Sequence, residues 1–394
     1  MSETLGDRLR KARKRVGLSP RDLARESGVS YSLITKIEQG ERQDTRWETL
    51  HRLARVLGTT TSALITGGSA DRVGIPAAEP SGAWHEVGRA LADTGSDVAE
   101  APTVRGVRAA VDAVTREYRG GNFSGVATLL PQLIRDAHAL ADLAPEGAAL
   151  RMRALTMAGR LLTQTRQYDL ADQALTRALR QAPDARTAAA AVDLRCWLLL
   201  RRGHVDEVRE LAVQWADDLE PRMSRATPTD LAMWGWLLLR AAAAAGRDNR
   251  PEEAAEALRL AHAAAVAVGR PHQLLDLGFI HTWSVGAVRM QRAEYAMVRD
   301  RPDEVLRLSA GVGVEQMSAT NGSRNRHLLD VAHAQVRTRR YAKAVETLSA
   351  VHRDAPQWLP HQRYAQDIVR LLTERRRTLT PDMRRLAEAV RLPL

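Results

Sequence analysis

Cysteine and large aromatic residues are scarce in this sequence. Its 394 residues include one Cys, two Phe and six Tyr. Cys196 has no second cysteine to pair with, so an internal disulfide is excluded and we expect a protein of the reducing cytoplasm. Most of the apolar content comes from Ala, Leu and Val rather than from the aromatic and β-branched residues that strands favour. The composition therefore predicts an all-α protein.

Long hydrophobic runs are also missing. The densest apolar stretch, residues 234–245, contains Arg240, and a membrane-spanning helix needs about 20 consecutive, predominantly apolar residues. The first 25 residues carry charges throughout and lack the apolar centre of a signal peptide. We therefore expect a soluble, cytoplasmic protein that has no membrane partner.

The sequence has none of the common catalytic or metal-binding motifs. It contains no glycine-rich phosphate loop, no His-Glu-x-x-His and no Cys-x-x-Cys. His327 and His333 are six positions apart, whereas two histidines on one face of a helix are three or four apart. We expect no enzymatic activity, no cofactor and no metal site.

Positive charge is concentrated near the N-terminus. The chain carries 58 Lys and Arg against 47 Asp and Glu, a net charge of +11, and residues 1–67 alone hold 13 basic against 8 acidic side chains. Basic density by itself is weak evidence for nucleic-acid binding, because arginine-rich solvated helices are common. The interpretation therefore depends on a motif.

Helical periodicity divides the chain into two parts. Apolar residues in 1–67 recur in short bursts that predict five short helices. Residues 68–82 are rich in Gly, Pro and small polar residues, which is typical of a linker. Residues 83–394 then alternate helix-length segments with turns. We predict an N-terminal domain at 1–67, a linker at 68–82 and a helical repeat domain at 83–394.

Residues 18–40, LSPRDLARESGVSYSLITKIEQG, have the pattern of a helix-turn-helix. Ser19 suits the N-cap of a helix that has Pro20 at its first position, Gly28 suits the tight turn, and Ser30 suits the next N-cap. If Ile34 and Ile37 face inward, the second helix presents one polar side to the DNA major groove. The base-reading candidates on that side are Tyr31, Ser32, Thr35 and Lys36.

This motif resembles the XRE family of Cro and repressor helix-turn-helix domains. In the phage repressors of that family, the residues matching Tyr31, Ser32 and Lys36 contact base edges. The resemblance also places Arg42 and Arg46 along the DNA backbone, where we expect them to contact phosphates. It makes Arg13 and Glu38 a structural charge pair. The family commonly has Gln where Pro20 stands, and that Gln anchors a phosphate. Each monomer is therefore expected to bind DNA more weakly than a family member that has the Gln.

Behind this domain, segments recur at a period of about 34 residues. The clearest, residues 152–185, resembles a tetratricopeptide repeat, with small residues such as Gly159 and Ala178 where two helices cross. A second clear copy spans 325–356, weaker ones lie at 189–221 and 286–310, and 103–140 and 230–269 are further helix pairs. We predict a tetratricopeptide-like α-solenoid, and an ordinary helical bundle is the alternative.

The combination resembles the peptide-sensing regulators of Gram-positive bacteria and similar actinobacterial regulators. It implies a sequence-specific transcription regulator in the cytoplasm, associated with the nucleoid when bound to double-stranded DNA. One half-site seldom gives enough specificity, so we expect a homodimer on a near-palindromic operator. The alternative is a DNA-tethered scaffold whose repeats recruit a partner protein.

The resemblance also implies effector binding on the concave face of the repeats. Several guanidinium groups beside a tryptophan suit a small anionic molecule or an acidic peptide. The repeat pattern maps these candidate ligand-binding residues to that face: Arg153, Arg160, Gln164, Asp193, Trp197, Arg201, Arg326, His333 and Arg337.

Overall fold

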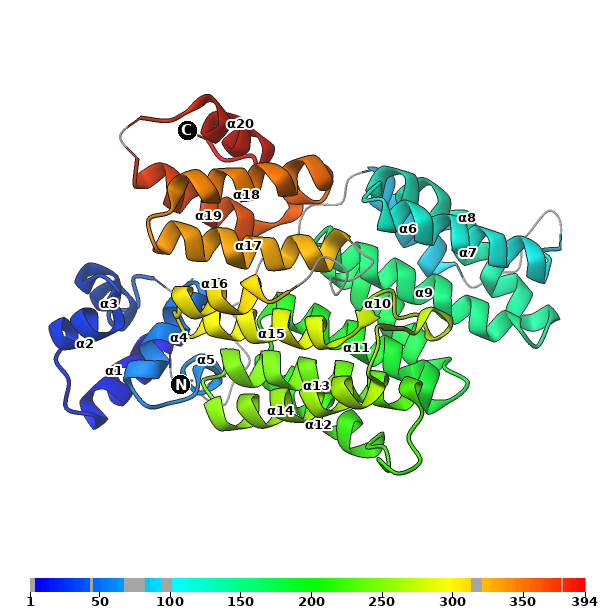
Figure 1. The fold of residues 1–394 in the computed structure, drawn as a ribbon, viewed down its shortest axis with the longest axis horizontal. Coiled ribbons are helices and arrows are strands. Elements are labelled where there is room, and N and C mark those ends of the chain that lie inside the picture. Colours follow the sequence, from blue (N-terminus) through cyan, green and yellow to red (C-terminus); the bar gives the residue numbers. More distant parts are fainter. Residues whose placement is uncertain are drawn as a thin grey trace.

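The computed structural model describes residues 4–42, 45–66, 82–93, 101–312, 321–376 and 378–393. Twenty α-helices make up nearly all of its regular structure within these ranges, and one two-stranded hairpin is the only sheet there (Figure 1). The predicted all-α fold is confirmed. No described helix has both the length and the apolar character that a membrane span requires.

The first five helices form a small N-terminal domain, here called the headpiece (residues 4–66). They are α1 (Leu5–Arg15), α2 (Pro20–Ser27), α3 (Tyr31–Glu38), α4 (Trp47–Val56) and α5 (Thr61–Thr66). Fully buried side chains from four of them, including Leu9, Leu23, Ile34 and Leu53, meet in one core. The five short helices expected from the sequence are therefore confirmed.

The remaining helices form the repeat domain (residues 82–393). They are α6 (Gly82–Ala92), α7 (Val104–Arg119), α8 (Phe123–Leu143), α9 (Gly147–Gln164), α10 (Tyr168–Arg180), α11 (Ala185–Arg202), α12 (Val205–Asp218), α13 (Pro228–Arg247), α14 (Pro251–Val268), α15 (Val285–Val298), α16 (Pro302–Ala310), α17 (Asn321–Arg337), α18 (Tyr341–Asp354), α19 (Arg363–Glu374) and α20 (Pro381–Ala389).

Consecutive helices from α7 to α20 pack in pairs. Each of the six predicted repeats and helix pairs coincides with one of these pairs, from α7–α8 to α17–α18. At the crossing of α9 and α10, a Cβ atom added to Gly159 would lie 2.4 Å from Leu175 Cδ2. The pattern of small residues therefore marks real helix crossings, because a larger side chain at Gly159 would collide with Leu175.

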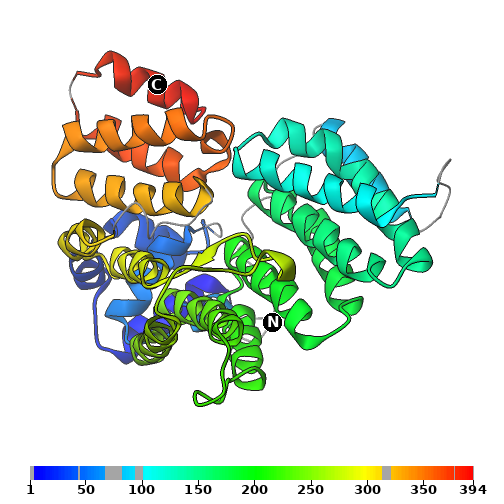
Figure 2. The same cartoon turned by 45° about the vertical axis from the view of Figure 1, so that its right-hand side comes forward.

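The stack of helix pairs bends until its two ends touch. Figure 2 shows the pairs following an arc from α6–α8, through α13, to α18–α20. At the closure, the backbone N–H of Ser124 donates to Gln357 Oε1 (3.1 Å), and Gln357 Nε2 donates to Asn122 Oδ1 (3.3 Å). The rings of Phe123 and His361 lie 6.3 Å apart. The concave face, expected as an open groove, is therefore the inner wall of a closed ring.

One short segment between α14 and α15 departs from the helix-pair pattern. It contains strands β1 (His272–Gln273) and β2 (Thr282–Trp283), which pair antiparallel around a 3₁₀ turn at Leu275–Leu277. Phe279 and Trp283 from this segment are almost fully buried. Trp283 packs against Gly235 and Trp236 of α13, and the segment brings His281 toward α9.

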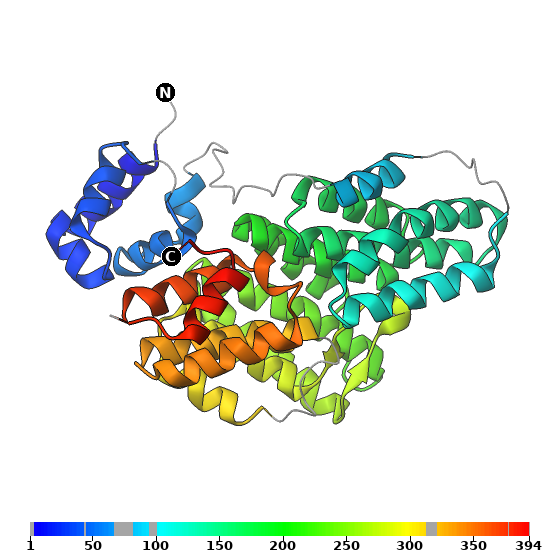
Figure 3. The same cartoon turned by 90° about the horizontal axis from the view of Figure 1, so that it is seen from above.

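The predicted linker at 68–82 lies outside the described residues except for Gly82, the first residue of α6. The repeat domain begins with α6, which packs on α8 and α10. The headpiece does not sit beside these helices. It contacts the turns that follow α13 and α15 and one residue of α19, far along the chain (Figure 3).

Candidate nucleic-acid interface and central chamber

Local capping bonds define the helix-turn-helix. The Ser19 hydroxyl accepts from Asp22 N while Asp22 accepts from Ser19 N, a reciprocal capping box with Pro20 at the first helical position. Gly28 ends α2 with φ of +66°, a conformation that most side chains disfavour. Ser30 then caps α3 by accepting from Leu33 N. Each of these features follows the sequence prediction.

The polar side of α3 is open. Ile34 and Ile37 are fully buried, whereas Tyr31, with 47% of its surface accessible, Ser32 and Lys36 are exposed. Thr35 is half-buried, and its hydroxyl donates to the carbonyl of Tyr31 (2.9 Å). Figure 1 shows α2 and α3 on the outer side of the headpiece, with α4 and α5 next to the repeat domain. The four base-reading candidates therefore lie on an unobstructed end or face of α3.

A buried ion pair sets the angle between α1 and α3. Arg13 donates through Nε to Glu38 Oε1 (2.7 Å) and through Nη2 to Glu38 Oε2 (2.8 Å), and its Nη1 donates to the Leu18 carbonyl. Both side chains are about one-tenth exposed or less. The hydrogen bond to Glu38 raises the pKa of Arg13. The expected structural charge pair is confirmed.

The two candidate phosphate-binding arginines lie in different surroundings. Arg42 is exposed just after α3, where its backbone N–H donates to the Lys36 carbonyl (3.3 Å). Arg46, at the N-cap of α4, points toward the repeat domain and lies 3.3 Å from Asp367 Oδ1 on α19. In this arrangement a carboxylate of the same chain occupies the place that a phosphate would take beside Arg46.

The contact between the headpiece and the repeat domain is here called the docking seam. It joins the headpiece residues Arg46, His51, Arg55, Thr59, Thr61 and Ser62 to Arg247, Asp248, Asn249, Arg299 and Asp367.

Hydrogen bonds to the turn after α13 dominate this seam. The Arg247 carbonyl accepts from the Thr61 hydroxyl and lies 2.8 Å from His51 Nδ1. Asp248, which is fully buried, accepts from Ser62 N (2.7 Å) and so stabilises the start of α5. Burial lowers the pKa of His51 to about 4. The seam therefore holds a neutral histidine.

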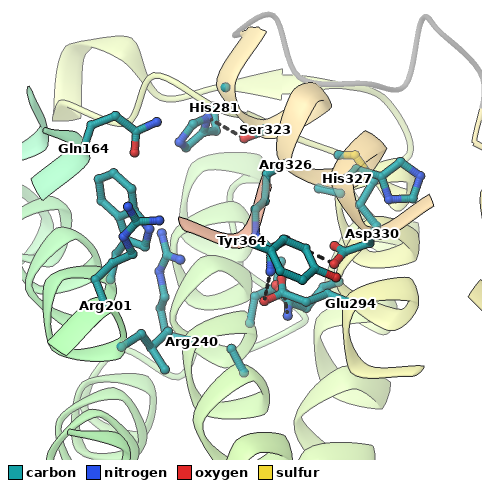
Figure 4. Close-up of a pocket in the computed structure, with 18 of the residues that line it drawn as sticks. Gln164, Arg201, Arg240, His281, Glu294, Ser323, Arg326, His327, Asp330 and Tyr364 are labelled. Atoms are coloured by element: carbon teal, nitrogen blue, oxygen red, sulfur yellow. Dashed lines mark hydrogen bonds and ion pairs between the residues drawn. The ribbon is translucent and has the colours of Figure 1, made fainter. Parts of the chain in front are cut away.

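The inside of the ring contains a cavity of about 270 Å³, here called the central chamber. Its walls come from the first helix of each pair, α7, α9, α11, α13, α15 and α17, and from residues around the start of α19. Figure 4 shows Gln164, Arg201 and Arg240 on one side and Tyr364, Glu294 and Asp330 on the other. His281 and Ser323 lie at the upper edge of this view, 3.0 Å apart.

Five of the nine candidate ligand-binding residues line this chamber: Arg160, Gln164, Trp197, Arg201 and Arg326. The other four lie elsewhere. Arg153 pairs with Asp112 (3.3 Å) at a neighbouring cavity, Asp193 is bound by Arg240, His333 Nδ1 lies 2.9 Å from the Tyr364 hydroxyl, and Arg337 pairs with Asp300 (2.7 Å).

Three of the chamber arginines are paired with carboxylates. Arg240 binds both oxygens of buried Asp193 (2.7 and 3.1 Å). Arg247 pairs with Glu294, and Arg326 pairs with Asp330 (3.1 Å). The guanidinium groups of Arg247 and Arg326 lower the pKa of Glu294 to about 2 against the effect of burial. Burial, together with the Glu294 charge, raises the pKa of Asp330 to about 6.

The other two chamber arginines have neutral partners. Arg160, only 2% exposed, contacts the Gly278 carbonyl (3.2 Å) and His281 Nε2 (3.3 Å). Arg201 donates to Gln362 Oε1 (3.2 Å). Neither lies within ion-pair distance of a carboxylate in the described part of the chain. Burial lowers the pKa of both guanidinium groups, because it disfavours their charged forms.

Sequence reasoning missed several chamber residues. Trp236, Arg240, His281, Glu294 and Tyr364 line the chamber, but the repeat pattern did not select them. Arg240 gave the clearest signal, since it interrupts an otherwise apolar run and therefore had to find a buried partner. His281 gave none, because it lies on the irregular segment between α14 and α15.

One comparison with known proteins supports the helix-turn-helix of the headpiece. No curated protein matches the chain. Among solved structures, the chain is similar to the apo form of ComR from S. thermophilus, with 14% sequence identity, coverage of 84% of this chain and 100% of that chain, and a TM-score of 0.30. Residues 4–64 match a family described as a helix-turn-helix domain. The headpiece is therefore a helix-turn-helix domain of the kind that the motif at residues 18–40 predicts.

Proposed function

We propose that the protein is a transcription regulator that binds a near-palindromic operator as a homodimer, with one α3 in the major groove of each half-site. The observation that carries this proposal is the capped helix-turn-helix whose polar α3 residues are open to solvent. One headpiece covers one half-site, and a single half-site gives little specificity against a genome of competing sites. Two chains are therefore required.

Base reading is assigned to the exposed side of α3. Lys36 suits donation to guanine O6 and N7, and Tyr31 suits packing against a thymine methyl group. The guanidinium of Arg21 lies 5.7 Å from the centre of the Tyr31 ring, which supports the ring's position at the start of α3. Ser32 and Thr35 complete the reading surface. Arg42 contacts a phosphate when DNA is bound, and Arg46 does so after it exchanges Asp367 for a phosphate.

The repeat domain regulates this binding. The central chamber is the effector site of the proposal, and an anionic effector suits its uncompensated arginines. The docking seam fixes the headpiece against the repeat domain, so a change in the repeats can change the orientation of α3 in each half of the dimer.

Substitution of Lys36 tests the base-reading role. We expect Lys36→Ala to weaken binding to the operator by about 1 to 3 kcal/mol, or about 5- to 150-fold, while binding to random DNA changes far less. Lys343→Ala, which removes an exposed lysine from α18, is the matched control and should change neither affinity. Equal losses on operator and random DNA would assign Lys36 to a phosphate instead.

Dimerisation is tested separately. Sedimentation of the full chain with an operator duplex should give two chains per duplex, and footprinting should show two protected half-sites about 10 base pairs apart, or a multiple of this. One chain per duplex at saturation would contradict the proposed dimer.

A further inference from the structure

The electrostatic imbalance of the central chamber is its most informative property. Five arginines line it, and the three carboxylates that pair with them are Asp193, Glu294 and Asp330. Among the described residues, Arg160 and Arg201 are therefore left without an ion-pair partner. A buried charge is costly unless it is paired, so a fold that keeps two such groups in one cavity favours an anion between them.

These two arginines lie on α9 and α11, which pack against each other and both contribute to the chamber wall. Both guanidinium groups act on the hydroxyl of Tyr118, where they oppose the rise in its pKa that burial causes. Gln164, one helical turn after Arg160, adds an amide donor and acceptor at the same wall. Guanidinium groups bind carboxylates through paired hydrogen bonds, so this part of the chamber suits a carboxylate group.

Part of the chamber wall is aromatic and apolar. The indole rings of Trp197, Trp236 and Trp358 contribute to it, together with Leu239 and Met290. The Trp236 ring packs edge-on against Trp283, with 5.4 Å between centroids, which fixes its orientation. Walls of this kind favour a flat apolar body over a polar chain.

The size of the chamber favours a compact ligand. About 270 Å³ is at the lower end of the range for small-molecule pockets, which is roughly 300 to 1,000 Å³. The contacts of Gln357 with Asn122 and Ser124 close the ring that surrounds it. A compact molecule therefore fits this volume better than a peptide of several residues does.

We propose that the central chamber binds a small aromatic carboxylate, with its carboxylate between Arg160 and Arg201 and its ring among the tryptophans. This inference deepens the proposed function by naming the effector class. Only the effect of the ligand on operator binding rests on the proposed function, because ligand binding itself is measurable without DNA.

A single residue links the chamber to the docking seam. The Arg247 side chain lines the chamber and pairs with Glu294, while the Arg247 carbonyl accepts from Thr61 in the headpiece. A carboxylate bound between Arg160 and Arg201 adds negative charge to the cavity that Glu294 and Arg247 also line, and so perturbs their ion pair at the end of α13. Ligand binding therefore changes the bonds that Asp248 and Arg247 make to α5.

Calorimetric titration of the full chain with 2-naphthoate, 2-naphthamide and a tetraglutamate peptide tests the ligand class. We expect 2-naphthoate to bind at one site per chain and the neutral amide to bind at least about tenfold more weakly, since charge-assisted hydrogen bonds are lost. Equal binding of acid and amide, or no binding of either, would overturn the proposal. Tighter binding of the peptide, with displacement of 2-naphthoate, would also overturn it in favour of a peptide site.

Matched variants test the site itself. Arg160→Gln and Arg201→Gln should each weaken 2-naphthoate binding about tenfold or more and abolish the preference for the acid over the amide. Arg202→Gln is the control, because Arg202 is the next residue on α11 and pairs with Asp169 outside the chamber. Unaltered thermal unfolding verifies that each variant is folded. A control that loses as much affinity as Arg201→Gln would place the ligand elsewhere.

Hydrogen exchange tests the link to the headpiece without DNA. Saturating 2-naphthoate should change exchange of the Thr61 and Ser62 amides, which donate to Asp248, and should change operator affinity by about 5- to 150-fold. Unchanged exchange at saturation would overturn the coupling through Arg247. Changed exchange without any operator binding would leave the ligand site standing and refute the proposed DNA function.

Discussion

The headpiece and the repeat domain both bury arginine, but they balance its charge differently. In the headpiece, buried Arg13 and Glu38 satisfy each other through two hydrogen bonds. In the central chamber, Arg240 is matched in the same way by Asp193, whereas Arg160 and Arg201 contact only neutral groups. Matched pairs fix the positions of helices, and unmatched arginines are available to a ligand.

The comparison predicts that removing a matched arginine costs far more than removing an unmatched one. Loss of one partner from a buried pair costs about 3–5 kcal/mol, because the remaining charge is buried alone. Loss of an unmatched arginine removes a buried charge that has no ion-pair partner and that therefore lowers the stability of the ligand-free protein. Three predictions follow this contrast from the largest effect to the smallest.

The largest effect is expected in the headpiece. Arg13→Met should destabilise it by about 3–5 kcal/mol, since buried Glu38 loses both of its short hydrogen bonds and keeps only the longer contact with half-exposed Arg10 (3.7 Å). Urea unfolding followed at the headpiece tryptophan Trp47 measures this loss. Arg15→Met, an exposed change on the same helix, should cost less than about 0.5 kcal/mol. A loss below about 1 kcal/mol for Arg13→Met would show that the pair is not structural.

The chamber allows the contrast to be tested within one domain. Arg240→Met should lower the stability of the repeat domain by about 3 kcal/mol, because Asp193 is only 1% exposed and loses both of its hydrogen bonds. Arg201→Met should leave the stability of the ligand-free protein unchanged or raise it. Thermal unfolding of the two variants gives the comparison directly. Equal destabilisation would contradict the assignment of Arg201 to ligand binding.

The docking seam provides the smallest effect and a dependence on pH. The buried His51 has a pKa of about 4, and an undocked headpiece restores an ordinary value near 6.5. Docking is therefore fully favoured above about pH 6.5 and weakens as the pH falls toward 4, by about tenfold at pH 5.5.

Neighbouring charges leave this direction unchanged. Burial, the largest effect on the pKa of His51, lowers it and decides the sign, while the hydrogen bond to the Arg247 carbonyl and the Asp248 charge raise it and the Arg55 and Arg247 charges lower it. Exchange of the Ser62 amide at pH 7.5 and 5.5, corrected for intrinsic rates, measures the docking equilibrium. His51→Gln should remove the pH dependence, and an unchanged dependence in that variant would show that another group is responsible.

Most of the headpiece was predictable because its signals are local. The caps at Ser19 and Ser30, the turn at Gly28 and the inward Ile34 and Ile37 all act within a few residues of one another. The helix pairs of the repeat domain were predictable for the same reason. A spacing of about 34 residues and small residues such as Gly159 report contacts between neighbouring helices.

The chamber and the seam were not predictable, because they depend on contacts between distant parts of the chain. The repeat pattern identified Arg160 and Arg201 on the concave face. It did not indicate that Gln357 would meet Asn122 and close the ring, nor that an irregular segment would bring His281 to Arg160. Arg46 shows the same limit, since its motif predicts a phosphate and only the tertiary fold supplies Asp367.

The position of the docking seam has a consequence for synthesis of the protein. The headpiece is complete at about residue 66, but Thr61 and His51 bind residues 186 and 196 positions later, and Arg46 binds Asp367. Domains fold as units during translation, with the N-terminal one first. The headpiece therefore folds on the ribosome long before its docking surface is made, and every newly made chain passes through a stage in which α3 is folded and not yet held by the repeats.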